Sequence, residues 1–141
     1  MPSLADVQAV EAHLRAGFDR CRIFTENDFA EPPKDGGAWL LIQFPWSRTE
    51  WDTIADANEE CEHVEEGAFR FVLSVDRGDG AHQAREWLGE IARLFRGREI
   101  GGLQCFSPSS PVTDDRSEAG NWFTVSIAVP YECVITQEVG P

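Results

Sequence analysis

The chain has 141 residues, of which 42% are hydrophobic and 26% are charged, so residues 1–141 are expected to fold as a single domain with a sizeable core. The 25 acidic and 12 basic residues give a formal net charge of −13, which argues against binding to nucleic acid phosphates or to an anionic membrane surface. No apolar run approaches the length of a membrane span, and the N-terminus lacks the pattern of a secretory signal.

The cysteines are widely spaced, and no pair has the C-x-x-C spacing of a zinc or redox site. Without an export signal, we expect them to be reduced and mostly buried thiols in a cytoplasmic setting. They are Cys21, Cys61, Cys105 and Cys133.

Two segments have the three- and four-residue spacing of apolar side chains that is typical of amphipathic helices. The first covers residues 3–19, with Ser3 as its N-cap. The second covers residues 80–96, begins after an acidic turn and ends near Gly97. The sequence therefore predicts two helices.

Several other segments have the alternation or the continuous hydrophobicity of β-strands. Pro45 is expected to end the second of them. The predicted strands cover residues 21–25, 38–44, 67–75, 100–106 and 121–135. The resulting order is helix, strand, strand, strand, helix, strand, strand. It favours an α+β fold, in which a single, mostly antiparallel sheet carries both helices packed on one face.

The region from Arg48 to Glu66 is strongly acidic and allows three interpretations. It is a solvated loop or strand extension that keeps the protein soluble, a metal site, or a contact surface for a basic partner. The metal site would use Glu59, Glu60, Glu62 and His63, but these residues lack the spacing of a calcium loop.

No catalytic, cofactor-binding or metal-binding motif is present, so we expect a protein that is not an enzyme and needs no cofactor. A surplus of tryptophans on or beside the predicted strands instead indicates a contact surface, since one helical layer would not cover them all. The candidate interface residues are Trp39, Trp46, Trp51, Trp122, Glu59, Glu60 and Glu62.

Three segments together resemble the phage tail terminator family, which includes the minor tail protein U of phage lambda and its relatives in long-tailed phages and gene transfer agents. These segments are residues 69–75, 87–95 and 120–131. The resemblance covers roughly half to two thirds of the chain by architecture rather than by a fixed motif. Residues 48–66 align with no part of the family pattern.

The resemblance implies a structural virion protein that forms a hexameric ring at the neck end of the tail, assembled in the cytoplasm of the bacterial host. The implied partners are the tail tube protein and the head connector or stopper protein. DNA would pass through the ring without specific binding. Six copies would carry 6 × (−13) = −78, and an acidic channel would repel phosphates.

Two alternatives stay open from the sequence. One is a head-tail connector or stopper protein, which belongs to the same structural class. The other is an acidic, DNA-mimic-like binding protein that presents its carboxylates to a basic partner.

Overall fold

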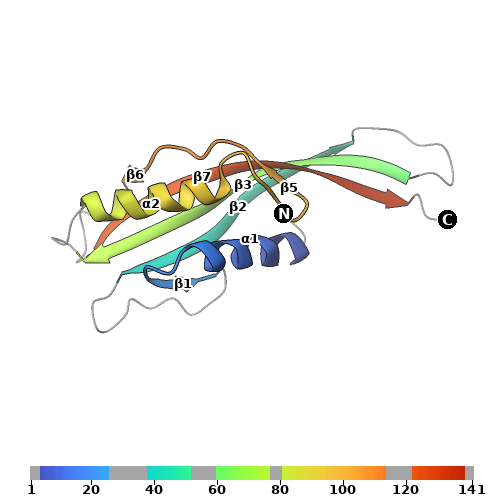
Figure 1. The fold of residues 1–141 in the computed structure, drawn as a ribbon. Coiled ribbons are helices and arrows are strands. Elements are labelled where there is room, and N and C mark those ends of the chain that lie inside the picture. The colour runs from blue at the N-terminus through green and yellow to red at the C-terminus, as the bar shows by residue number, and fades with distance from the viewer. Residues whose placement is uncertain (1–3, 26–37, 52–59, 77–80, 114–121, 139–141) are drawn as a thin grey trace.

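The computed structural model describes residues 4–25, 38–51, 60–76, 81–113 and 122–138. These residues form two α-helices and seven β-strands, which belong to one sheet (Figure 1). In chain order they are α1 (Leu4–Gly17), β1 (Arg22–Phe24), β2 (Trp39–Trp51), β3 (Glu60–Asp76), α2 (Ala81–Phe95), β4 (Glu99–Ile100), β5 (Leu103–Cys105), β6 (Val112–Thr113) and β7 (Trp122–Glu138).

The sheet has the order β1-β2-β3-β7-β5-β4, and β6 pairs separately with β7. Strands β1 and β2 run parallel, whereas every other described pair is antiparallel. The predicted fold, a mostly antiparallel sheet in a seven-element order, is wrong: the parallel β1–β2 pair makes this curled sheet a mixed one, and the described residues form nine elements and a mostly β protein. The additional strands have only two or three residues, which is too short for an alternating pattern to show in the sequence.

The hydrophobic core lies between the two helices and the apolar faces of the two longest strands, β3 and β7. Phe69, Phe71 and Leu73 of β3 are fully buried, as the alternation in the sequence requires. The ring of Phe95, at the end of α2, lies 5.4 Å from the ring of Phe69 and 5.1 Å from that of Phe71. Buried residues of α1, including Leu14, belong to the same core cluster, so both helices close one hydrophobic core.

The two helices pack directly against each other. A Cβ atom on Gly17 of α1 would lie 2.5 Å from Cδ2 of Leu94 in α2, so the absence of a side chain allows this close approach. His13 makes a hydrogen bond of 2.7 Å with the carbonyl oxygen of Leu94. Beyond the end of α1, Arg20 pairs with Glu90 across 3.1 Å. These contacts fix the C-terminal half of α1 beside α2.

Three strands continue past the helices as a long ribbon (Figure 1). We call this part the arm; it comprises residues 47–51 of β2, 60–67 of β3 and 131–138 of β7. The pairing of β3 with β7 runs without a break from Glu60 opposite Glu138 to Asp76 opposite Trp122. The described residues thus place a three-stranded projection on one end of the molecule.

The strand β2 enters the arm through Pro45. The prediction that Pro45 ends the strand is wrong, because β2 continues to Trp51 after a register shift between Gln43 and Trp46. An irregularity of this kind accommodates a proline, which has no amide hydrogen to give to the ladder.

Candidate assembly surfaces

The arm carries part of the predicted interface. Trp51 lies opposite His63, Glu60 opposite Glu138 and Glu62 opposite Thr136 in the strand register. For Trp51, Glu60 and Glu62 the structure describes the backbone only. The acidic region is therefore a strand extension on both sides of residues 52–59, rather than one continuous loop.

The rest of the predicted interface does not gather in the arm. Trp46 lies at its base, opposite Ala68, and is described by its backbone. Trp39 and Trp122 lie at the other end of the sheet, next to the end of β3. Glu59 lies outside the described residues. The structure consequently separates the predicted set into two groups at opposite ends of the sheet.

Trp39 is half-buried, and its ring packs edge-on against Phe24 of β1, with the ring centroids 6.0 Å apart. This contact ties the edge strand β1 to β2 in addition to their parallel pairing. For Trp39 the structure thus gives a packing role within the protomer.

Part of the described surface of the arm is charged. Glu66 is exposed and lies 3.8 Å from the guanidinium of Arg48, a pair that is too exposed to contribute much stability. Glu132 of β7 is partly exposed. The arm therefore presents carboxylates to solvent beside a single arginine.

One carboxylate of this region is buried instead. Glu65 has 2% of its surface exposed, and its Oε2 accepts a hydrogen bond of 3.4 Å from Sγ of Cys133. Burial, with a smaller contribution from Glu65, raises the pKa of Cys133 to about 12. The pKa of Tyr131 is also raised, first by burial and then by the charge of Glu65. The interpretation of the acidic region as solvated thus does not hold for Glu65.

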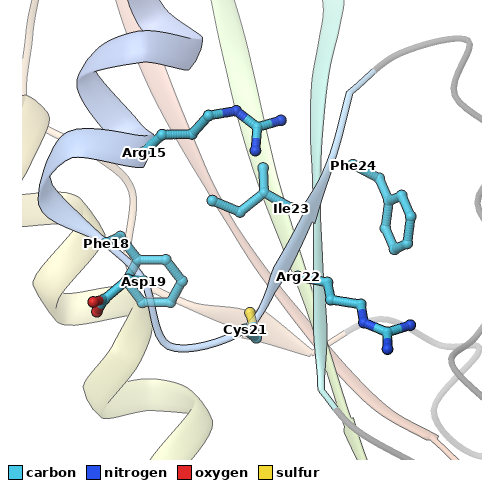
Figure 2. A pocket seen from close by; sticks show the side chains of 7 residues that line it. All are labelled: Arg15, Phe18, Asp19, Cys21, Arg22, Ile23 and Phe24. Atoms are coloured by element: carbon cyan, nitrogen blue, oxygen red, sulfur yellow. The ribbon is translucent and has the colours of Figure 1, made fainter.

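A groove lies between the end of α1 and β1, at the end of the sheet away from the arm (Figure 2). It has a volume of about 520 Å³. Its apolar surface comes from Phe18, Ile23 and Phe24, and Arg15 and Arg22 add positive charge. Figure 2 shows the guanidinium group of Arg15 between α1 and β1, whereas that of Arg22 lies on the other side of β1, the side of the Phe24 ring.

A second hollow, of about 420 Å³, lies beside β4, β5 and β7, where β7 enters the arm. Two exposed apolar side chains line it, Phe106 with 45% and Val134 with 57% of its surface accessible. Glu99, Gln104 and Glu132 surround them. Exposed apolar surface with a polar rim is typical of protein contact sites.

The described residues contain no group of three or more His, Cys, Asp or Glu side chains arranged to hold a metal ion. The proposed metal ligands are not tested by this observation, because Glu59 lies outside the described residues and Glu60 and Glu62 are described by their backbone. Neither described helix is long and apolar enough to cross a membrane.

A family model of phage tail terminator proteins matches residues 7–131, which include most of α1, all of α2, strands β1 to β6 and β7 as far as Tyr131. The chain belongs to the phage tail terminator family. This family consists of structural virion proteins of the tail and not of enzymes. The resemblance seen in the sequence is thereby confirmed at the level of the family.

Solved structures add support for the fold of this terminator. One chain with 22% sequence identity matches with a TM-score of 0.50, over 87% of this chain and 94% of its own length. At that identity the likeness concerns the fold alone. A comparison with curated proteins finds no match.

The sequence reasoning missed the basic groove and the apolar hollow of this terminator. Three of the 12 basic residues, Arg15, Arg20 and Arg22, occur within eight positions, which is a visible signal in so acidic a chain. Val134 is displaced by one position from the buried face that contains Tyr131 and Cys133, so strand alternation also predicts its exposure. For Phe106 we find no comparable signal.

Proposed function

We propose that six copies of this chain form a ring that closes the end of the tail tube and joins it to the head connector. The observation that carries the proposal is the match to the terminator family over residues 7–131. A protein that caps a tube needs separate surfaces for its own copies, for the tube and for the neck. The candidates for these contacts are the arm, the groove between α1 and β1, and the hollow around Phe106 and Val134, which adjoins the base of the arm and shares Val134 with it.

The charge of the chain agrees with a ring through which DNA passes. With −13 per copy, six copies carry −78, so the ring repels a polyanion along its length. Repulsion lets DNA move through without sticking to the wall. A protein that held DNA would need lysines and arginines gathered on one face.

The experiment is to remove the protein from the assembling particle and then add it back. Without it, we expect tail tubes that have no cap and do not join to filled heads, as seen by electron microscopy. Wild-type protein should restore the joined particles, and a label on the protein should lie at the neck end of the tail.

Three results would contradict the proposal. Normal joined particles in the absence of the protein would remove its role. A label that stays on the head before tails join would indicate a stopper protein instead. Native mass measurement that shows a monomer both alone and with tube protein would exclude the ring.

A further inference from the structure

We propose that copies of this chain join through the edges of their sheets: β7 in the arm of one copy pairs with β2 in the arm of a second copy. This inference rests on the proposed ring and names the contact that builds it. The partner is another molecule of the same chain, and the contact is made by backbone hydrogen bonds.

Strand β7 has one paired side and one side that is open in the arm. On the first side it pairs with β3 as far as Glu138. On the other side it pairs with β6 and β5, and among the described strands none continues this pairing beyond Glu132. Residues 133–138 therefore form a strand edge about 20 Å long, since each residue advances about 3.3 Å along a strand.

One hydrogen bond shows which backbone groups of β7 face the open side. The carbonyl oxygen of Pro130 accepts a bond of 2.9 Å from the amide of Phe106, on the side of β5. In an antiparallel ladder, alternate residues direct their amide and carbonyl groups to the same side, and the register with β3 has no break. The residues that direct these groups to the open side are therefore Val134, Thr136 and Glu138.

The open edge begins at the hollow that contains Phe106 and Val134. Val134 is the first residue beyond the β5 pairing that directs its backbone to the open side, and 57% of its surface is accessible. The hollow, of about 420 Å³, is also lined by Gly102 and Glu132. A strand placed beside β7 would cover Val134, so pairing there buries apolar surface and completes backbone hydrogen bonds together.

The arm has a second strand edge on its opposite side. Strand β3 lies in the middle of the arm, and β2 is the other outer strand (Figure 1). Among the described strands, only β1 lies beyond β2, and it pairs with β2 no further than Leu41. Glu50 of β2 and Val134 of β7 both lie opposite Val64 of β3, so the two outer strands reach the same level of the arm.

The direction of the two outer strands suits a ring. Both run antiparallel to β3, so β2 and β7 run parallel to each other. A rotation about an axis along the arm places β2 of one copy beside β7 of the next, in the same direction. Each copy then uses a different edge toward each neighbour, and this head-to-tail contact gives a ring when the rotation closes. Pairing between two β7 edges would instead give a closed dimer and leave β2 exposed.

The two segments that meet in this contact carry little formal charge. Residues 47–51 contain one arginine and one glutamate, 1 − 1 = 0, and residues 133–138 contain only Glu138. Four of the glutamates of the arm belong instead to residues 60–67 of the middle strand. Because the contact uses backbone hydrogen bonds rather than ion pairs, association should not weaken as the salt concentration rises.

The first test removes one amide from the open edge. Thr136→Pro deletes an amide that faces the open side, and Pro130 already occupies an equivalent position of the same strand. We expect this variant to associate about tenfold more weakly than wild type in sedimentation, because proline cannot donate to the added strand. The control is Ser110→Pro, at an exposed position between β5 and β6 outside the arm and the hollow, which should associate like wild type. Circular dichroism and thermal unfolding verify that both variants are folded.

The second test follows the amides of β7 by hydrogen exchange. In the assembled wild-type protein, the amides of Val134, Thr136 and Glu138 should exchange much more slowly than in the dilute, unassembled protein. The amides of Cys133 and Ile135 face β3 and should be protected in both states. This alternating gain of protection is specific to the addition of a strand.

The third test identifies the segment that occupies the edge. A photo-crosslinker in place of Val134 should label residues 47–51 of another copy. A crosslink to residues 133–138 of another copy would indicate pairing between two β7 edges. A crosslink to added tube protein would assign the edge to the tube. Either of these two results would overturn the inference.

The two proposals fail in different ways. If wild type forms rings but Thr136→Pro forms them equally well, or the alternate amides gain no protection, the strand-pairing inference is overturned and the ring stands. Association that weakens steeply with salt would indicate ion pairs and would overturn it as well. If wild type stays monomeric even with tube protein, both proposals fall. If Thr136→Pro does not fold, hydrogen exchange and the crosslink decide the inference, since both keep Thr136.

Discussion

The backbone amide of Gly102 donates a hydrogen bond to Oδ1 of Asp6, with 3.2 Å between nitrogen and oxygen. This bond ties the turn between β4 and β5 to the first turn of α1. The neighbouring Gly101 has a φ of 60°, a left-handed conformation, and a Cβ atom there would lie 3.0 Å from Cβ of Ala9. The β4–β5 turn and α1 are thus fitted to each other beside the base of the arm.

Replacing Gly101 with alanine should destabilise the protein. The left-handed conformation costs an L-residue about 1–2 kcal/mol, and the close approach to Ala9 adds to that cost. We expect the free energy of unfolding, measured with urea, to fall by more than the conformational cost alone.

Two other glycines provide the comparison. Gly97 has a similar φ of 66°, but nothing in the described part of the chain lies within 4 Å of the place that a Cβ atom would take, so Gly97→Ala should show the conformational cost without the clash. Gly89 lies in α2 with the same open space, and Gly89→Ala should stabilise the protein by about 0.5–1 kcal/mol. Equal losses for Gly101→Ala and Gly97→Ala would contradict the packing argument.

Replacing Phe95 with alanine should remove a central part of the core. Phe95 is fully buried against the rings of Phe69, Phe71 and His13, so the loss should be about 3–5 kcal/mol, measured by urea unfolding. Phe95→Leu should lose less, because it leaves a smaller cavity. Leu4→Ala serves as the control, since Leu4 is 73% exposed. A loss at Phe95 no larger than that at Leu4 would show that this cluster does not stabilise the fold.

Much of the fold follows from side-chain periodicity. The helices at Leu4–Gly17 and Ala81–Phe95 lie within the predicted ranges, and the predicted buried face of β3 is the observed one. The parallel pairing of β1 with β2 was not predictable in this way, because periodicity specifies the faces of a strand but not its neighbour. The continuation of β2 and β3 through glutamates was one of the alternatives left open by the sequence, since these residues are depleted in strands.

The candidate site was less predictable than the fold. Tryptophans signal apolar area, but the sequence does not show that Trp39 already packs against Phe24 within the protomer. It likewise does not distinguish Glu65, buried beside Cys133, from its exposed neighbour Glu66. The surfaces now available for contact, the groove and the hollow, arise where elements distant in the sequence meet, so local patterns do not reveal them.

The hollow lined by Phe106 and Val134 should matter for assembly more than for folding. Replacing both with serine changes exposed side chains, so the free energy of unfolding should change by no more than about 1 kcal/mol. We expect weaker association with tube protein or with further copies, measured by co-sedimentation. Val112→Ser is the control, because Val112 is 60% exposed but does not line the hollow. Unchanged association of the double variant would remove this surface from the proposed contacts.

The buried thiols should make the fold sensitive to alkaline pH. The pKa of Cys105 is raised to about 11 and that of Cys133 to about 12, mainly because burial disfavours the thiolate. In the unfolded chain these thiols titrate near pH 8.5, so above that pH the folded state binds more protons than the unfolded state. Stability is therefore fully present below about pH 8.5 and decreases as the pH rises toward the folded values.

This decrease should become smaller when a thiol is removed. Cys133→Val keeps a side chain of similar size without a titrating group, so its urea midpoint should fall less than that of wild type between about pH 8 and 11. The chain has a single tyrosine, Tyr131, whose raised pKa acts in the same direction and leaves a residual slope in the variant. Val112→Ala, at an exposed position without a titrating group, should keep the full wild-type slope. Equal losses of stability with pH in Cys133→Val and Val112→Ala would show that folding does not raise the pKa of Cys133. The thiol beside Glu65 would then be accessible to water.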